Sequence, residues 1–288
     1  MKYECIERRR THYPVRMMCP LLGVSRSGYY AWRSRPESER AQQDRLLMPK
    51  IRRIHQSSYG TYGSLRVQAE LSQEGVRIGR RKVARLMRSA RLIGCPKRRF
   101  RVTTKPEPAH RVAKNLLKQN FTAFAPNQLW ASDITYVSTS KGWLYLAVVM
   151  DLYSRRIIGW SMSRWMSRGI VINALKMAIS SRQPEPGLIH HSDRGSQYTS
   201  DDFRGELTKH GIECSMSGIG NCYDNAVVES FFGVLKRERV NRRRYLNPDE
   251  ARADIFHYIE VFYNRKRRHG YCGNMSPADF ETQSAGSF

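Results

Sequence analysis

The sequence predicts an α/β core built on a mixed sheet, preceded by a basic, all-α region. Apolar residues at helical spacing occupy residues 12–91, whereas runs rich in β-formers begin near residue 128 and then alternate with helices. Charge changes along the chain in the same way: residues 1–120 hold 29 Lys and Arg against 8 Asp and Glu, and the remaining 168 residues hold 21 against 17. The N-terminal part is therefore predicted to be a basic module and the C-terminal part a nearly balanced one.

The composition narrows the class of protein. A chain of 288 residues with 40% hydrophobic residues can fold into more than one domain, and its net charge of +25 indicates a polyanionic partner, nucleic acid first. No apolar run approaches the ~18 residues that span a membrane, and residues 1–10 do not read as a signal peptide. The six cysteines form no CxxC pair, so neither a disulfide framework nor a zinc finger is indicated. We expect a protein of the reducing bacterial cytoplasm, associated with the nucleoid and not with a membrane.

The basic region contains the features of a helix-turn-helix. Residues 12–35 predict two short helices with Gly23 in the turn and Ser25 as N-cap, and a further helix covers residues 44–56. Residues 64–72 and 79–91 then predict a helix pair whose second member points basic side chains outward. These side chains, which we expect to contact DNA, are Arg80, Arg81, Lys82, Arg85 and Arg88. Periodicity does not separate base reading from simple phosphate contact.

The core is predicted to follow the order βββαβαβα, with helices on both faces of the sheet. The expected strands are residues 128–137, 143–151, 155–163, 188–192 and 212–216, and the expected helices are 168–181, 201–210, the helix that begins after Asp224, and 249–263. The expected domains are a basic helical segment 1–43, a helix-turn-helix domain 44–102, a linker 103–120, a catalytic core 121–240, and a C-terminal helix and tail 241–288.

The helix that follows Asp224, its expected N-cap, carries an acid and a base on one narrow polar stripe. At 100° per residue, Asn225 and Lys236 lie within 40° of Glu229, whereas most apolar residues of this helix fall on the other side. Taken alone, this pattern also suits an ordinary solvated surface face.

Two aspartates upstream change that interpretation. Asp133 lies in mid-strand, where Asp is depleted and expensive to bury unpaired, and Asp193 ends a later strand. If the first and fourth strands are neighbours, Asp133, Asp193 and Glu229 converge. Converging carboxylates repel one another and need cations, and oxygen ligands without His or Cys favour Mg²⁺ or Mn²⁺. Two such ions activate the attacking oxygen and stabilise the leaving oxygen in phosphoryl displacement.

Other polar residues near these carboxylates receive structural interpretations. Asp151 suits the turn that follows the second strand, and His190 and His191 are expected to orient or pack, because Mg²⁺ rarely selects imidazole. No motif pairs Cys222 with a base, so a packing role is expected for it.

Four segments resemble the second-reading-frame (OrfB) transposases of two-frame bacterial insertion sequences, which have an integrase-type DDE catalytic core. They are Trp130–Tyr136, Asp151–Trp160, His191–Tyr198 and Asn225–Lys236. Thirty-five residues separate Asp193 from Glu229, which is the D,D-35-E spacing of that family, and Lys236 matches its basic residue two helical turns later. Residues 263–269 and 276–277 resemble its C-terminal signature, and residues 55–94 its helix-turn-helix.

The resemblance implies a ribonuclease H-like core in which Asp133, Asp193 and Glu229 hold two Mg²⁺ ions, with Mn²⁺ able to substitute. Water then cleaves the element end, and the freed 3′-hydroxyl attacks a second phosphodiester, while Lys236 contacts the DNA. The partners implied are double-stranded DNA of the element ends and the target, further copies of the chain on that DNA, and the upstream-frame (OrfA) protein or a fusion with it. No heptad run occurs in this sequence, so the upstream frame is where the resemblance places the leucine zipper.

Two alternatives stay open at this point. A DNA-binding regulator with an idle core would explain the basic region equally well, although the intact set of three acids speaks against a decayed site. A plain metal-dependent nuclease of the same fold differs from a strand transferase only in the attacking oxygen.

Overall fold

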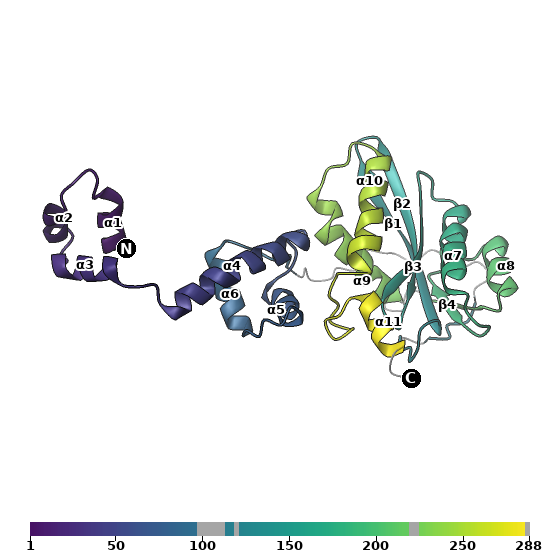
Figure 1. Ribbon diagram of the computed structural model, residues 1–288. Coiled ribbons are helices and arrows are strands. Elements are labelled where there is room, and N and C mark those ends of the chain that lie inside the picture. Colours follow the sequence, from purple (N-terminus) through teal and green to yellow (C-terminus); the bar gives the residue numbers. More distant parts are fainter. Residues whose placement is uncertain (97–112, 118–120, 219–224, 286–288) are drawn as a thin grey trace. The chain divides into compact units, whose positions relative to one another are not determined.

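The computed structural model describes residues 1–96, 113–117, 121–218 and 225–285 of the chain (Figure 1). These residues form two compact units, Met1–Arg52 and Arg53–Phe288. The division falls inside one helix, α4 (Glu39–Ser57). Asp224 and Cys222, for which capping and packing roles were predicted, lie outside the described residues.

The first unit packs α1 (Lys2–Arg9), α2 (Val15–Leu21) and α3 (Arg26–Ser34) around a small core. Its fully or almost fully buried side chains are Ile6, Cys19 and Tyr29. The Ser25 hydroxyl accepts a hydrogen bond from the Gly28 N–H at 3.0 Å, and Gly23 adopts φ +60° in the turn before it. The two predicted helices are therefore confirmed with their turn and cap, while α1 is an addition that the charged sequence did not suggest.

After the end of α4, the second unit continues with the predicted helix pair. It consists of α5 (Ser64–Gln73) and α6 (Arg80–Ser89), with Gly75 at φ +79° in the turn after α5. Val83, Leu86 and Met87 face inward from α6, as their spacing predicted. The apolar side of α6 is thereby used for packing, which leaves the basic side as its outer face.

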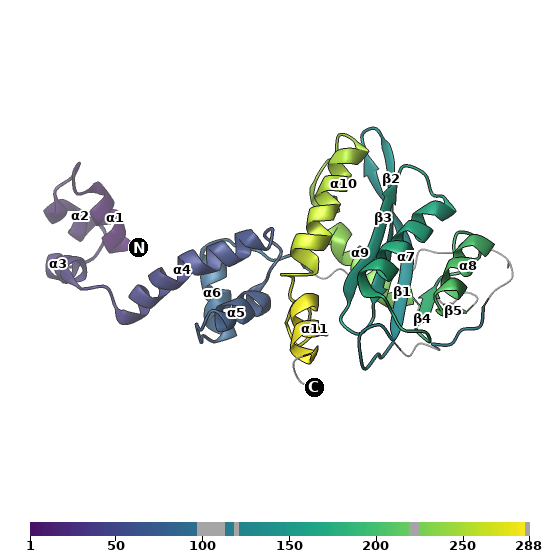
Figure 2. The same ribbon diagram turned by 45° about the vertical axis from the view of Figure 1, so that its right-hand side comes forward.

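A mixed five-stranded sheet forms the centre of the second unit (Figures 1 and 2). Its spatial order is β3-β2-β1-β4-β5, with β1 antiparallel to β2, β2 antiparallel to β3, and the two pairs that involve β4 parallel. The strands are β1 (Leu129–Thr139), β2 (Gly142–Asp151), β3 (Arg156–Ser163), β4 (Ile189–Ser192) and β5 (Glu213–Met216). The predicted order βββαβαβα and the mixed sheet are confirmed, and the strand ends differ from prediction by two residues at most.

Helices cover both faces of this sheet, as both views show (Figures 1 and 2). One face carries α7 (Arg168–Arg182) and α8 (Asp201–Lys209), and the other carries α9 (Ala226–Glu238) and α10 (Pro248–His257). A Cβ on Gly159 of β3 would lie 2.2 Å from the Ala174 carbonyl oxygen of α7. Glycine therefore permits the helix to approach the strand this closely. None of the helices in the described ranges combines the length and the apolar character that a bilayer crossing requires.

The predicted last helix, residues 249–263, changes its winding partway. Regular α10 ends at His257 and continues as a π-helical segment, η3 (Tyr258–Tyr263). Tyr258, Ile259, Phe262 and Tyr263 of η3 are all almost fully buried. This π-helical segment thus contributes a set of buried side chains to the core of the second unit.

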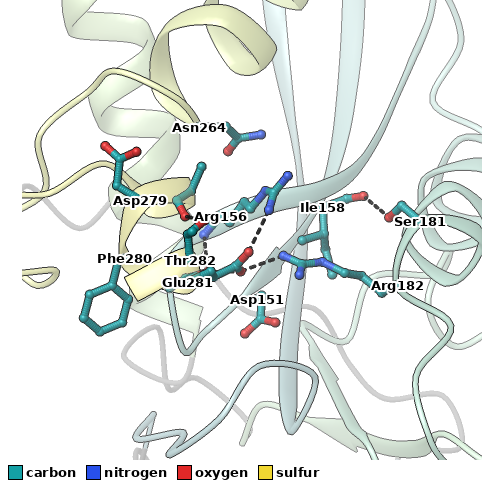
Figure 3. A network of polar contacts seen from close by, with 12 residues as sticks. Asp151, Arg156, Ile158, Ser181, Arg182, Asn264, Asp279, Phe280, Glu281 and Thr282 are labelled. Atoms are coloured by element: carbon teal, nitrogen blue, oxygen red, sulfur yellow. Dashed lines mark hydrogen bonds and ion pairs between the residues drawn. The ribbon is translucent and has the colours of Figure 1, made fainter. Parts of the chain in front are cut away.

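The C-terminal helix α11 (Pro277–Ala285) is fixed to the sheet by one buried carboxylate (Figure 3). Glu281 accepts hydrogen bonds from the Ser154 hydroxyl at 2.6 Å, from Arg156 at 2.7 Å and from Arg182 at 2.6 Å. Nearby, the Asn264 amide pairs with both the N–H and the carbonyl of Ile157 at 3.0 and 2.8 Å. Asn264 thus satisfies backbone groups of β3, an edge strand that has a single strand neighbour in the sheet.

Candidate active site

The first two predicted acids are brought together by the pairing of β1 with β4. These strands are parallel neighbours, and their last registered pair is Ala131 with His191. Asp133 and Asp193 each lie two residues beyond this pair, so they leave the same end of the paired region. The condition on which convergence depended, that the first and fourth strands are neighbours, is met. This end of β4 is a carboxyl end, where open α/β sheets place their sites.

The helix α9 packs beside β1 and brings the third acid to the same place. At its start, the Asn225 amide donates a hydrogen bond to the Ser132 carbonyl oxygen at 3.2 Å. Three turns later, the Lys236 ammonium lies 4.9 Å from the centre of the Tyr136 ring in β1. Glu229 follows Asn225 by four residues and shares its side of the helix, so it lies along β1 between these two contacts. The polar stripe predicted for this helix is the side that borders the strand.

The three carboxylates interact electrostatically. Burial, followed by repulsion from Asp193 and then from Glu229, raises the pKa of Asp133 well above its usual value, although the Ile134 N–H and Lys236 oppose the rise. Burial also raises the pKa of Asp193, against a hydrogen bond from the Gly195 N–H. Burial and the charge of Asp193 raise the pKa of Glu229. A site in which negative charge costs free energy favours the binding of cations.

Backbone N–H groups hold two of these side chains in place. Asp133 Oδ1 accepts from the Ile134 N–H at 2.7 Å, and Asp193 Oδ1 accepts from the Gly195 N–H at 3.0 Å. A Cβ on Gly195 would lie 3.0 Å from the same Asp193 oxygen, so a larger residue there would require this carboxylate to shift by a few tenths of an ångström. Tyr198 is buried near these acids: its hydroxyl has no hydrogen-bond partner among the described residues, and Asp133 and Asp193 add to the effect of burial in raising its pKa.

The two histidines before Asp193 are engaged by serines. His190 Nε2 lies 2.7 Å from the Ser132 hydroxyl, and His191 Nδ1 lies 2.9 Å from the Ser215 hydroxyl. Burial lowers the pKa of His190 to about 3, so this ring is neutral. They pack and orient the strand ends, as their sequence context predicted, and leave the candidate site with carboxylate ligands.

The three acids offer carboxylate oxygens as donors for a metal ion. Across the described residues, no three or more His, Cys, Asp or Glu side chains are already arranged to hold a metal ion. The charge of Asp193 nevertheless raises the pKa of both Asp133 and Glu229, and all three acids provide oxygen donors. Hard oxygen donors of this kind suit Mg²⁺ or Mn²⁺. The chemistry of these residues therefore fits Mg²⁺ or Mn²⁺. Asp133, Asp193 and Glu229 would be the protein ligands of such an ion.

The predicted DNA-contacting residues divide into two places. Arg80, Arg81, Arg85 and Arg88 of α6 are exposed and Lys82 is half-buried. Lys236 belongs to the carboxylate site itself, because its charge interacts with Asp133. The pKa of Lys236 lies below its usual value, because the effect of burial exceeds the opposing effect of the Asp133 charge.

Several supporting residues were not singled out from the sequence. The sequence places Asn225 on the polar stripe, but local spacing does not indicate its contact with β1 or the contacts of Tyr198 and Glu238. Glu238 carries a sequence signal: it is an acid on the apolar side of an amphipathic helix, where a charge needs a partner. That partner, Arg267, lies 29 residues away, so its identity could not be read from local spacing.

Family models match three parts of the chain: an HTH-like domain at residues 41–100, an integrase core domain at 123–222, and a second integrase core domain at 229–285. An insertion element IS600 uncharacterized 31 kDa protein of Shigella sonnei is 48% identical over 91% of this chain and 97% of its own length. Transposase InsF for insertion sequence IS3A of Escherichia coli (strain K12) is 41% identical over 99% of both chains.

The chain belongs to the OrfB-type insertion-sequence transposases. It is therefore a DNA strand-transferring enzyme with an integrase catalytic core, and the interpretation as a regulator with an idle core is not favoured. Among solved structures, the HTLV-2 integrase catalytic core domain in complex with magnesium covers 56% of the transposase with 20% identity and a TM-score of 0.44. That match includes 99% of the integrase chain. A simian T-cell lymphotropic virus intasome chain covers 80% of the transposase, and 74% of that chain is matched, with 18% identity and a TM-score of 0.47.

Proposed function

We propose that Asp133, Asp193 and Glu229 are the catalytic acids of this transposase and hold two Mg²⁺ ions. The observation that carries the proposal is the convergence of the three acids where β1, β4 and α9 meet, where the charge of Asp193 adds to burial in raising the pKa of Asp133 and of Glu229. Bound Mg²⁺ would neutralise the acids and stabilise charge on the attacking and leaving oxygens. The chain's own residues orient Asp133 and Asp193 through backbone N–H groups, and they offer Lys236 to a DNA phosphate.

The reaction needs no nucleophilic side chain. Water attacks the phosphodiester at the element end and releases a 3′-hydroxyl, and this hydroxyl attacks a target phosphodiester in one transesterification. The five domains predicted from the sequence, 1–43, 44–102, 103–120, 121–240 and 241–288, are proposed as its functional parts. We propose action at the nucleoid of the bacterial cytoplasm, on DNA, by several copies together with the OrfA protein or a fusion to it.

The proposal is tested with the full chain and a labelled duplex that carries the element's own end sequence. We expect Mg²⁺-dependent cleavage at the end followed by joining to a second duplex, and loss of both on chelation with EDTA. Adding the OrfA protein separates a missing partner from a missing activity. Cleavage without joining under every condition would identify a plain nuclease, and DNA binding without cleavage, even with OrfA present, would contradict the proposed catalytic site.

A second prediction concerns α6. We expect the Arg81→Ala/Arg88→Ala double variant to weaken DNA binding and to reduce the slope of log K against log salt by about 0.9 for each phosphate that the variant no longer neutralises. Both side chains are exposed, so folding should persist. Binding should be measured by fluorescence anisotropy at several salt concentrations.

The control for this prediction is Arg252→Ala/Arg265→Ala, which removes the same charge from exposed positions outside α6. A weakening that is uniform across DNA sequences would indicate phosphate contacts, and a weakening confined to the element end would indicate base reading. Equal slopes for the parent, the α6 variant and the control would show that α6 does not contact DNA.

A further inference from the structure

Two large aromatic side chains are exposed side by side on the sheet. Tyr136 of β1 is 56% exposed and Trp143 of β2 is 50% exposed, although Thr135 and Val137 on either side of Tyr136 are buried. Their ring centres are 5.1 Å apart and the rings meet edge to face at 89°. One ring thus supports the other, while about half of each remains open to solvent.

This aromatic pair lies near the carboxylate site along β1. Tyr136 follows Asp133 by three residues, an axial separation of about 10 Å at strand spacing, and the odd separation directs the two side chains to opposite faces of the strand. Lys236 connects the two places, because its ammonium lies 4.9 Å from the centre of the Tyr136 ring and its charge interacts with Asp133. A ligand that spans from the acids to the aromatic pair would therefore pass Lys236.

The chemistry of this surface matches a nucleic-acid strand. Every base has a flat face that stacks on aromatic rings whatever its sequence, and a lysine beside the ring can meet the neighbouring phosphate. One DNA strand rises about 3.4 Å per nucleotide, so about 10 Å separates the scissile phosphate from a base two or three nucleotides away. The chain's net charge of +25 favours such a partner over another basic surface.

We propose that Tyr136 and Trp143 form a stacking surface for an unpaired base of the DNA strand, two or three nucleotides from the phosphodiester that is cut, with Lys236 on the phosphate between. The proposal rests on the proposed function, because it takes the scissile phosphate to lie at Asp133, Asp193 and Glu229. Stacking offsets the cost of opening a base pair near the end of the element. The surface would thereby hold that strand in line with the acids.

The test compares variants on intact DNA and on DNA with one abasic nucleotide, placed in turn at each of the first three positions beside the cleavage site. Binding is measured without divalent metal. We expect Tyr136→Leu to weaken binding to intact DNA by about 5- to 100-fold, with little further weakening on DNA abasic at the stacking position. Tyr136→Phe keeps the ring and should bind as the parent does.

Lys236→Gln provides the matched control, since removing a phosphate-binding charge should weaken binding equally on intact and abasic DNA. The parent and Tyr136→Phe should quench the fluorescence of a 2-aminopurine placed at the stacking position. Tyr136→Leu and Trp143→Leu should quench it less. Equal weakening of Tyr136→Leu on intact and abasic DNA at all three positions would overturn the proposal. So would a change in the DNA-free oligomeric state of the Leu variants without a change in quenching, which would make the surface an interface between copies.

Parent protein from the same preparation is assayed for Mg²⁺-dependent cleavage with the OrfA protein present. If the parent cleaves DNA but Tyr136→Leu weakens binding equally on intact and abasic DNA, only the stacking surface is contradicted. If Tyr136→Leu weakens binding on intact DNA alone and the parent does not cleave, the stacking surface is supported and the proposed catalysis is contradicted.

Discussion

Glu229→Gln is expected to abolish strand cleavage and joining while the protein stays folded. The substitution keeps side-chain size and helix propensity but removes one negative charge from the carboxylate site. Because positioned metal supplies most of this chemistry, activity should fall by roughly three powers of ten or more. DNA binding should persist, because the exposed arginines of α6 are unchanged.

The stability of the same variant gives an independent readout. Burial and Asp193 raise the pKa of Glu229, so its ionised form is disfavoured in the folded chain and the cost appears as pH rises through that raised value. Without divalent metal, Glu229→Gln should therefore melt at the same temperature as the parent or higher at pH 7, and any gain should vanish at pH values below the ordinary pKa of 4.5. Mg²⁺ should raise the melting temperature of the parent more than that of the variant.

Glu185→Gln makes the same charge change at an exposed loop position and should leave cleavage, melting and the response to Mg²⁺ unchanged. Full cleavage activity in Glu229→Gln would exclude Glu229 as a metal ligand. An equal response to Mg²⁺ in the parent and the variant would exclude it as well.

The sequence predicted the strands well because their apolar alternation is local and their ends coincide with turn residues. The mid-strand Asp133 was informative for the same reason, since only a site or a partner explains a carboxylate there. The pairing of β1 with β4 was different: it joins segments 60 residues apart, so local patterns could give it only as a condition for convergence. The sequence pattern therefore identified the acids as candidates, but it did not predict where they lie relative to one another.

The C-terminal part shows where local patterns fail. Residues 263–269 matched a family signature, but nothing in their spacing indicated what they contact. In the structure, Asn264 pairs with β3, Arg267 binds Glu238, and Arg268 binds Glu70 of α5 at 2.8 Å. Each of these contacts spans from 29 to 198 residues of chain. Long-range polar partners of this kind become visible only once the fold is known.

The buried ion pair of Glu238 and Arg267 is expected to be the most sensitive point for stability. Both side chains are 2% exposed. Glu238 accepts from Arg267 at 2.7 and 2.8 Å and from the Tyr258 hydroxyl at 2.9 Å, and Arg66 of α5 lies 3.4 Å away. Glu238→Ala should lower the free energy of unfolding by about 3–5 kcal/mol, because it leaves Arg267 buried without its partner. Urea unfolding at pH 7 measures this decrease.

The sign of the pH dependence follows from the same contacts. Burial alone would raise the pKa of Glu238, but Arg267 and then Arg66 lower it below its ordinary value of 4.5. The ionised carboxylate therefore stabilises the fold above that pH, and the contribution is lost as pH falls through the lowered value. The difference between the parent and Glu238→Ala should accordingly shrink in acid and stay constant from pH 6 to 8.

A double-mutant cycle separates the pair from its surroundings. Glu238→Met/Arg267→Met should lose less stability than the two single variants added together, since no unpaired charge remains buried. Arg164→Ala breaks the exposed Arg164–Asp249 pair and should cost less than about 1 kcal/mol. Strictly additive single effects would mean that the two charges do not depend on each other. A coupled effect would mean that the end of α9, the helix that carries Glu229, is held by Arg267 through Glu238.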